Sequence, residues 1–527
     1  MIEHHASIPE PRPGLDHSDN RRPKTRTNET SARRVLVAAF LLISGLSTLW
    51  ALASPLMSVP DEQSHTIKAA AVVRGELLGS PDAKQGDASS VTVPAYIAAL
   101  EGLQCYAFKA GTTAACAVPV GDDATLITAS TTAGNYNPLY YFVAGLPTLF
   151  VAGAPAIYAM RILSAVMCSA FLAMTFAAAA KFPRPDWPFA SAAVGLTPMV
   201  LFLCGAVNPN ALEIAAAASF FFNLCAVFQA RGVSSGVRSN MVFVGISGAV
   251  LANTRPLSLL WIALAFVAAL VIYGFRPLLA VLKGWLGLLM TLLVGAGCIA
   301  ALWWLVVADS LRSLTGAPTE IAPGDAFLAM VEKALDDGSG WIGRMGWLDT
   351  TLPNSIYVHW YLMMGALLVA GLSVRPLRSR LAPALLVVAL VLVPAFLQAQ
   401  VIGDLGWIWQ GRYVLALVLV ILLCCGTVMS NTTIPAGAQS RSIARLIIGF
   451  TVFAHLYAFL FTLRRYVAGL TAVPEWDLML VDPAWQPPIP WQGLTTVYLT
   501  LLVLAGVAAY RYLYSPSVQG AVNTGKG

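Results

Sequence analysis

The residues best suited to acid–base chemistry stand directly after the first long apolar run of the chain. They are Asp61, Glu62 and His65, all within a stretch of five residues. If a helix begins at Pro60, Asp61 and His65 lie at positions i and i+4 and share one face. Asp61 is then a candidate general base, oriented by His65 or Glu62. The alternative is an N-terminal helix cap, because acidic residues are favoured at that position.

Three arginines, Arg161, Arg255 and Arg412, lie at the ends of other apolar runs. A charged side chain in the middle of a membrane span costs about 2.5–3.5 kcal/mol, so such a residue is expected to have a partner or a function. Guanidinium groups match phosphate oxygens, which makes these arginines candidates for holding a lipid phosphate. Pairing of Arg161 with Glu213, or a headgroup position for Arg412, is the structural alternative.

Further polar and aromatic residues fall beside the same ends of the apolar runs and are candidates for lining a substrate cleft. Tyrosine at a membrane interface is most often a belt residue, which is the alternative for the tyrosines. The candidates are Asn137, Tyr140, Tyr141, Asn208, Asn210, Glu213, Trp347, Asp349, Gln410 and Tyr413.

These residues must be positioned by membrane helices. The chain has 527 residues, of which 57% are hydrophobic and only 11% charged, against roughly 25% charged in soluble domains. We predict an all-α polytopic bundle of about 12 (11–13) spans, each long enough to cross roughly 30 Å of hydrocarbon. The spans are predicted at 35–57, 156–180, 188–206, 210–230, 240–254, 256–274, 285–308, 357–373, 382–402, 413–430, 442–463 and 492–514.

The net charge of +6 does not indicate nucleic-acid binding, because the basic residues lie in short segments between the apolar runs. This pattern is typical of cytoplasmic loops. It holds only if the short apolar run 137–153 does not cross, so we predict a re-entrant helix there. The outer loops are then 58–155, 309–356 and 464–491, and the N-terminus is cytoplasmic.

Residues 1–34 are predicted to be a disordered basic cytoplasmic tail, and residues 515–527 a second cytoplasmic tail. Residues 240–274 are two short spans in this scheme, although one long broken helix is an alternative. Cys105 and Cys116 both fall in the first outer loop and are candidates for a disulfide. A metal site is not defined; Asp61 and Glu62 offer oxygen ligands for Mg²⁺ or Mn²⁺, but only two of them.

A set of short motifs resembles the predicted bacterial membrane proteins grouped as domain of unknown function 2142. The resemblance covers nearly the whole chain after residue 34, and the set is specific although no single member is. The motifs are PDE at 60–62 with His65, NPLYY at 137–141, RILS at 161–164, TPMVLF at 197–202, NPNALE at 208–213, NTRP at 253–256, GWLDTTLP at 346–353 and QGRY at 410–413.

That family in turn resembles the GT-C glycosyltransferases, which carry an acidic pair in the first outer loop and use polyprenyl-phosphate sugars. The resemblance implies a GT-C-like bundle in the bacterial cytoplasmic membrane with its active site facing outside. It implies Asp61 as the base, and Arg255, Arg412 and Arg161 as ligands of the donor phosphate.

An inverting transfer from a polyprenyl-phosphate sugar to an envelope glycan or glycolipid is the function that this resemblance implies. The chain lacks the soluble outer domain of many GT-C enzymes, so a small or lipid-linked acceptor, or a partner subunit, is expected. A glycolipid flippase or transporter, and a glycan polymerase or ligase using a lipid-pyrophosphate donor, are the alternatives.

Overall fold

The computed structural model describes residues 24–81, 88–230, 235–310, 316–431, 440–471 and 476–514, and most of them are helical. The helices are α1 (Lys24–Ala53), α2 (Glu62–Val72), α3 (Ala95–Ala98), α4 (Pro138–Gly145), α5 (Gly153–Ala179), α6 (Asp186–Gly195), α7 (Pro198–Cys204), α8 (Pro209–Gln229), α9 (Arg238–Ala252), α10 (Ser258–Tyr273), α11 (Phe275–Leu282), α12 (Trp285–Val307), α13 (Pro323–Glu332), α14 (Ser339–Ile342), α15 (Asn354–Ser373), α16 (Leu377–Leu405), α17 (Leu415–Ser430), α18 (Ser440–Val467), α19 (Trp476–Val481) and α20 (Trp491–Leu513). The strands are β1 (Ser80–Pro81), β2 (Ser89–Pro94), β3 (Leu126–Thr131), β4 (Arg344–Met345) and β5 (Thr350–Thr351).

The predicted polytopic all-α bundle is confirmed, with a slightly smaller number of spans. Within the described residues, 9 helices are long and apolar enough to cross a membrane, or up to 11 if two bent pairs each count as one span. The pair α6 and α7 bends by 65°, and the pair α10 and α11 bends by 108°. The expected 12 spans included residues 240–254, but helix α9 there has only 15 residues.

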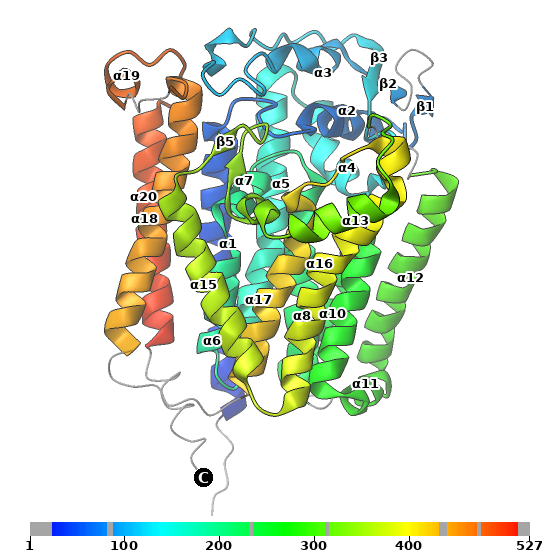
Figure 1. The fold of residues 1–527 in the computed structure, drawn as a ribbon, viewed down its shortest axis with the longest axis vertical. Helices are drawn as coiled ribbons and strands as arrows, with labels where there is room; N and C mark the ends of the chain where they lie inside the picture. Colours follow the sequence, from blue (N-terminus) through cyan, green and yellow to red (C-terminus); the bar gives the residue numbers. More distant parts are fainter. Residues whose placement is uncertain are drawn as a thin grey trace, which may run out of the picture.

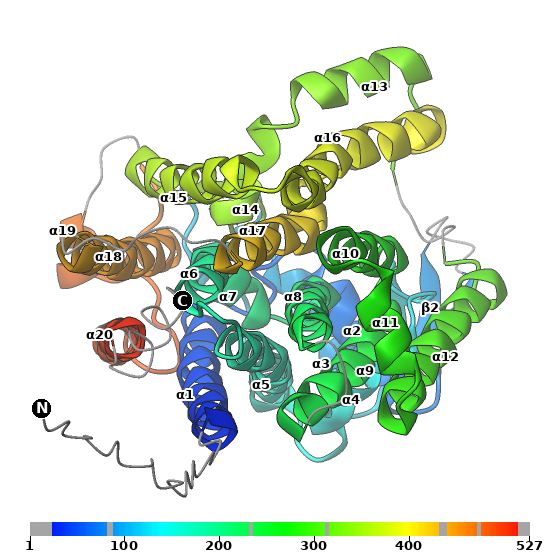
Figure 2. The same ribbon diagram turned by 90° about the horizontal axis from the view of Figure 1, so that it is seen from below.

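Helices α8 and α17 form the centre of the bundle (Figure 2). All residues of the apolar stretch of α8 are buried within the protein, and so are 94% of those in the apolar stretch that contains α17. Helix α8 packs against α5, α9, α10 and α17, and its run of alanines at 215–218 allows the neighbouring backbones to approach closely. The outer helices α12 and α20 are far less covered by protein. Only 11% of the residues in the apolar stretch of α12 and 17% of those in the apolar stretch of α20 are buried within the protein.

The longer segments between the spans gather at one end of the bundle, which we call the loop end (Figure 1). It carries α2, α3 and α4 together with the antiparallel sheet β1–β2–β3, in which Val91 pairs with Ala129. The buried Lys68 of α2 ties this region together by donating to the carbonyls of Leu77 and Gly134 at 2.6 and 2.5 Å. Hydropathy did not predict this sheet.

The disulfide expected between Cys105 and Cys116 is present, with the two Cα atoms 6.1 Å apart. Arg465, at the end of α18, donates to the carbonyl oxygens of Tyr106, Lys109 and Thr112 inside the disulfide-closed segment. The first loop is therefore fastened to a helix that lies some 350 residues further along the chain, as the separations of 353–359 residues show.

Three boundary predictions have clear outcomes. Residues 137–153 hold only the 8-residue helix α4 and a short 3₁₀ turn, so this segment is too short to cross. Residues 240–274 form two separate helices, because the chain breaks at 253–257 between α9 and α10. The predicted disorder of residues 1–34 is wrong for its last part, since α1 begins at Lys24; residues 1–23 and 515–527 lie outside the described residues.

Candidate functional site

Asp61 is the N-cap residue of α2, yet its side chain does not cap the helix. Its backbone is left-handed, with φ 67° and ψ 1°, a conformation that Asp tolerates better than most residues. This turn directs the carboxylate away from the helix, where Oδ2 accepts a hydrogen bond from Nη2 of Arg412 at 2.6 Å. The side chain of Asp61 remains 49% exposed although protein surrounds the residue closely. The carboxylate is therefore accessible from outside the protein.

Arg412 lies in the 3₁₀ turn Gly411–Val414 that precedes α17, and its side chain is only 1% exposed. A second nitrogen, Nη1, is 3.4 Å from the carbonyl oxygen of Pro60. The guanidinium also lies 5.4 Å from the ring centre of Tyr413. Arg412 thus binds Asp61 and the residue before it, which fixes the carboxylate in place.

Arg255 approaches the same tyrosine independently, with its guanidinium 4.9 Å from the ring centre of Tyr413. In the described part of the chain, no carboxylate lies within salt-bridge distance of Arg255. Burial acts to lower the pKa of Arg255, but the neighbouring Tyr136 and Glu213 raise it on balance, so the group is charged. A fixed cation without a paired anion is suited to binding an anionic ligand.

The position of Arg255 is set by a contact between two loops that the motifs had singled out separately. Asn137, the N-cap of α4, donates from Nδ2 to Oδ1 of Asn253 at 2.8 Å. Asn253 in turn donates to the carbonyl of Gly297 on α12 at 3.0 Å. The chain therefore leaves α9 in a defined direction, and Arg255 follows two residues later.

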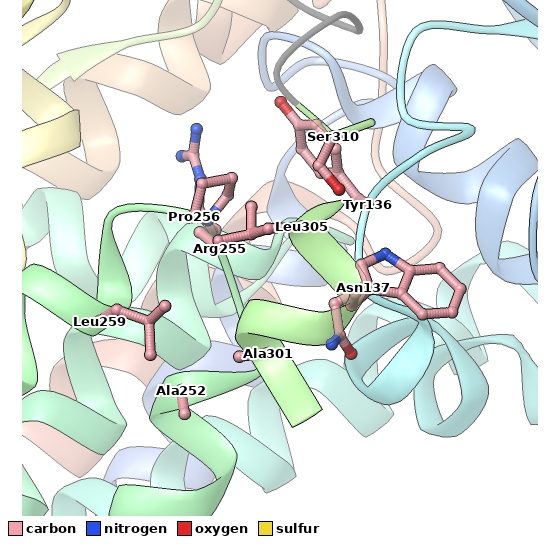
Figure 3. Close-up of a pocket in the computed structure, with 10 residues that line it drawn as sticks. Tyr136, Asn137, Ala252, Arg255, Pro256, Leu259, Ala301, Leu305 and Ser310 are labelled. Atoms are coloured by element: carbon pink, nitrogen blue, oxygen red, sulfur yellow. The ribbon is translucent and has the colours of Figure 1, made fainter. Parts of the chain in front are cut away.

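A cavity of about 290 Å³, including its open mouth, lies beside Arg255 (Figure 3). In Figure 3 the side chains of Arg255 and Tyr136 extend to the same side of this cavity. Its remaining wall is largely apolar, with Leu259 from α10 and Ala301 and Leu305 from α12. The cavity thus offers a cation next to apolar surface, which matches the two parts of a lipid phosphate.

Two arginines act on the protonation of Asp61. Burial acts to raise the pKa of Asp61, but Arg412, through its charge and its hydrogen bond, outweighs this effect together with His65 and Arg255 and holds the pKa below its ordinary value. Burial lowers the pKa of His65 to about 3, so the imidazole is neutral. Its Nδ1 lies 2.8 Å from the hydroxyl of Tyr141. Arg412, rather than the predicted His65, therefore orients Asp61.

Glu62 has a structural position that its neighbour lacks. Both of its oxygens accept from Arg161, at 2.7 Å from Nε and 2.6 Å from Nη2, and both side chains are fully buried. Arg161 also donates to the carbonyls of Ala51, Ser54 and Pro55. All five of its N–H groups are thereby engaged. The predictions that Glu62 is catalytic and that Arg161 binds the donor phosphate do not fit this geometry.

Most of the predicted cleft residues are also buried. Tyr140 and Tyr141 are 0% exposed, and the hydroxyl of Tyr140 pairs with Ser164 at 3.0 Å. Asn208 caps α8 by accepting from the N–H of Asn210, and Glu213 accepts from Ser258 at 2.7 Å. Asn208, Asn210 and Glu213 are each at most 2% exposed. These residues support the site from behind instead of lining it.

The predicted residues of the second loop divide in the same way. Trp347 donates from Nε1 to the carbonyl of Met57 at 3.0 Å, and Asp349 forms an ion pair with Arg465 at 3.0 Å. Both contacts fasten the loop, whereas Gln410 lines a second cavity next to Arg412. The sequence did not single out Trp304 or Asp337 for any role, because nothing but the fold brings them beside the site.

The residues at the site do not fit a divalent cation. Asp61 is the one exposed carboxylate there and faces two guanidinium groups, while Glu62 is fully engaged by Arg161. Across the described ranges, no group of three His, Cys, Asp or Glu side chains is arranged to hold a metal. We therefore derive no step through Mg²⁺ or Mn²⁺.

Comparison with known proteins gives a family and a distant structural likeness. The family profile described as "Predicted membrane protein (DUF2142)" matches residues 44–422. No curated protein matches the chain. Among solved structures the chain is similar to ArnT from Cupriavidus metallidurans in the apo state, with a TM-score of 0.41 and 14% identity, covering 91% of this chain and 76% of that chain. A similarity this low does not identify the function of the chain.

Proposed function

The chain belongs to the DUF2142 family of predicted membrane proteins, and from this premise we propose that it is an inverting membrane glycosyltransferase. It moves a sugar from a polyprenyl-phosphate carrier to a cell-envelope glycan or glycolipid. One observation carries the proposal: Arg412 fixes the half-exposed carboxylate of Asp61, and the guanidinium of Arg255 approaches the ring of Tyr413, which Arg412 also approaches. Among the described residues, Arg255 has no carboxylate within salt-bridge distance. The proposed base and the proposed anion ligand are thus connected through Arg412 and Tyr413.

In this proposal the donor phosphate binds at Arg255. The adjoining cavity provides apolar surface from α10 and α12, which suits the first isoprene units of the carrier. Helix α12 is mostly exposed to lipid, so a chain in this cavity is close to the bilayer. Arg412 is then a positioning residue for Asp61, although the sequence placed it among the phosphate ligands.

The chemical step is a single displacement at the anomeric carbon. The acceptor hydroxyl attacks this carbon, its proton passes to the carboxylate of Asp61, and the bond between the anomeric carbon and the phosphate oxygen breaks. The electron pair of that bond stays with the polyprenyl phosphate. Arg255 stabilises the negative charge that grows there, because a cation binds the departing phosphate monoester, which gains a second negative charge, more strongly than the singly charged diester of the donor.

The orientation in the membrane supports an outer active site. The turn between α5 and α6, which carries Lys181, and the helix α11, which carries Arg276, lie at the end of the bundle opposite to the loop end (Figure 1). Basic loops face the cytoplasm, which supports an outer position for the loop end. A nucleotide sugar is absent from that side, so a lipid-linked donor is required.

The test is sugar transfer in membranes from a panel of radiolabelled polyprenyl-phosphate sugars, with Asp61→Asn compared to wild type. Asp122→Asn is a matched control, because Asp122 is exposed in the same loop. We expect the wild type and the control to transfer label to a glycan or glycolipid, and Asp61→Asn to lose transfer while it still binds undecaprenyl phosphate. Equal transfer by Asp61→Asn would remove Asp61 as the base. Binding without turnover in all three proteins would favour a glycolipid transporter.

A further inference from the structure

A second cavity adjoins Arg412. It measures about 390 Å³ including its open mouth, and Arg412 forms part of its wall. Since Nη2 of Arg412 binds the carboxylate of Asp61, the cavity lies one side chain away from the proposed base. Its other polar and aromatic lining comes from Asp337, Arg344, Trp409 and Gln410.

The wall of this cavity is built by close packing between two distant segments. A Cβ on Gly411 would lie 2.2 Å from the carbonyl oxygen of Asp337, so only glycine permits this approach. The buried Gln398 holds the adjoining loop, since its Oε1 accepts from the N–H groups of Ile408 and Trp409 at 3.2 Å each. The indole of Trp409 is thereby held on the cavity wall by a rigid support.

One residue that lines the cavity has a strained backbone, as does Asp61 beside Arg412. Leu348, which also lines the cavity, has a φ of 62°, and Asp61 has a φ of 67°. A positive φ is a genuine outlier for a bulky residue such as Leu and costs about 1–3 kcal/mol. Such strain persists where the surrounding structure imposes it and is concentrated at binding sites.

The lining chemistry differs from that of the cavity beside Arg255. An indole ring, a carboxylate, a guanidinium and an amide converge here, and Arg344 is exposed to solvent. An aromatic ring can cover the C–H face of a sugar, while the polar groups match its hydroxyls. A polyprenyl chain would instead leave these polar groups unpaired.

The direction of the displacement separates the two cavities by role. In an inverting reaction the acceptor oxygen approaches the anomeric carbon from the face opposite to the leaving group. If the phosphate leaves at Arg255, the acceptor must approach from the side of Asp61 and Arg412. The second cavity adjoins Arg412 and therefore lies close to the proposed base that accepts the proton.

We propose that the cavity formed by Asp337, Arg344, Trp409 and Gln410 is the acceptor subsite, which binds a hydroxyl-rich carbohydrate and presents one hydroxyl to Asp61. This inference rests on the proposed glycosyltransferase function. It assigns to the chain a carbohydrate-binding surface that is separate from the donor cavity.

Two substitutions in the cavity have matched neighbours outside it. Trp409→Ala removes an aromatic ring from the cavity wall, and Asp337→Asn removes a charge from it. The controls Trp407→Ala and Asp336→Asn change the same residue types at exposed positions that do not line the cavity. Each variant is measured for transfer from the radiolabelled donor to the acceptors present in the membrane, and for binding of tritiated undecaprenyl phosphate. Binding of undecaprenyl phosphate depends on the donor cavity and not on the acceptor. Retained binding also shows that the variant is correctly folded.

The acceptor subsite predicts that Trp409→Ala and Asp337→Asn each reduce transfer by about tenfold or more, the equivalent of one lost hydrogen bond or stacking contact to the acceptor. Both should bind undecaprenyl phosphate as the wild type does, and the two controls should transfer normally. Normal transfer by both cavity variants would overturn the subsite and leave the glycosyltransferase proposal intact. Loss of undecaprenyl phosphate binding by a variant that keeps a monodisperse size-exclusion peak would assign the cavity to the donor and also overturn the subsite. A wild type that transfers from no donor would refute the function itself, and the subsite with it.

Discussion

The adjacent carboxylates Asp61 and Glu62 provide a sharp test, because the structure assigns them opposite roles. Glu62→Gln should unfold the protein more easily, and Asp61→Asn should leave its stability nearly unchanged. The two substitutions are chemically identical in kind and lie next to each other in the chain. Any difference between them therefore reports on their surroundings.

The expected size of the effect of Glu62→Gln follows from the burial of its ion pair. Glu62 and Arg161 are both 0% exposed, and their two hydrogen bonds measure 2.7 and 2.6 Å. Removing one charge leaves the other buried without compensation, which costs about 3–5 kcal/mol. Glutamine also has one acceptor oxygen fewer than glutamate. In the wild type, the N–H of Val207 donates to Oε1 of Glu62 at 3.1 Å.

The pair of Asp61 with Arg412 is different, because the carboxylate is 49% exposed. A half-exposed ion pair contributes about 0–1 kcal/mol. Asparagine also tolerates the left-handed backbone at this position as aspartate does. Asp61→Asn should therefore cost about 1 kcal/mol or less in stability.

The assay is the folded fraction of purified protein in detergent after heating, followed by fluorescence-detected size-exclusion chromatography. We expect Glu62→Gln to lose its monodisperse peak at a clearly lower temperature than wild type, and Asp61→Asn to match wild type. A Glu62→Gln variant as stable as wild type would refute the structural assignment of this pair. An Asp61→Asn variant that is equally destabilised would show that the Asp61 pair is also structural.

Three further predictions concern the ligands, the pH dependence and the orientation. Arg255→Ala should weaken the binding of undecaprenyl phosphate by about 1.5–3 kcal/mol, the range for a charge-assisted hydrogen bond. The control Arg276→Ala, at the opposite end of the bundle, should bind normally. An affinity of Arg255→Ala equal to that of wild type would exclude Arg255 as the phosphate ligand. Arg412→Gln should move the acid limb of the transfer rate to higher pH, because burial, which raises the pKa of Asp61, then acts without the main charge that lowers it. Since Asp61 acts as a base only when deprotonated, activity is lost as the pH falls through this pKa; an unshifted limb with a uniformly lower rate would indicate a purely structural Arg412. A membrane-impermeant maleimide should label Asp122→Cys in intact cells and Ser239→Cys only after permeabilisation, and the reverse pattern would overturn the assigned orientation.

Much of the fold could be predicted from the sequence because hydrophobic length alone identifies a membrane helix. The spans at 156–180 and 210–230 match α5 and α8 to within a few residues. Bends could not be predicted in the same way. Residues 188–206 read as one continuous apolar run, yet the chain turns by 65° between α6 and α7, next to the packed Gly195.

The site was only partly predictable, because its decisive contacts join residues that are far apart in sequence. Asp61 and Glu62 are equivalent by type and position, and only Arg161, 99 residues later, and Arg412, 351 residues later, distinguish them. Tyr140 and Tyr141 sit in a motif beside the site, but burial directs both rings into the core. The positions that lie near the site could be predicted, whereas the partner of each side chain could not.

The ion pair between Glu62 and Arg161 also has a consequence for biosynthesis. At about 5–20 residues per second, the ribosome reaches Arg161 about 5–20 s after Glu62. During this interval Glu62 has no partner, and Arg161 later enters the membrane at the start of α5 with a charge that is costly to insert. The start of α2, and with it Asp61, can be fixed only when α5 has been inserted and the two charges have met. Assembly of the site is therefore timed by the insertion of α5, and a chain interrupted before that helix would leave the first loop unanchored.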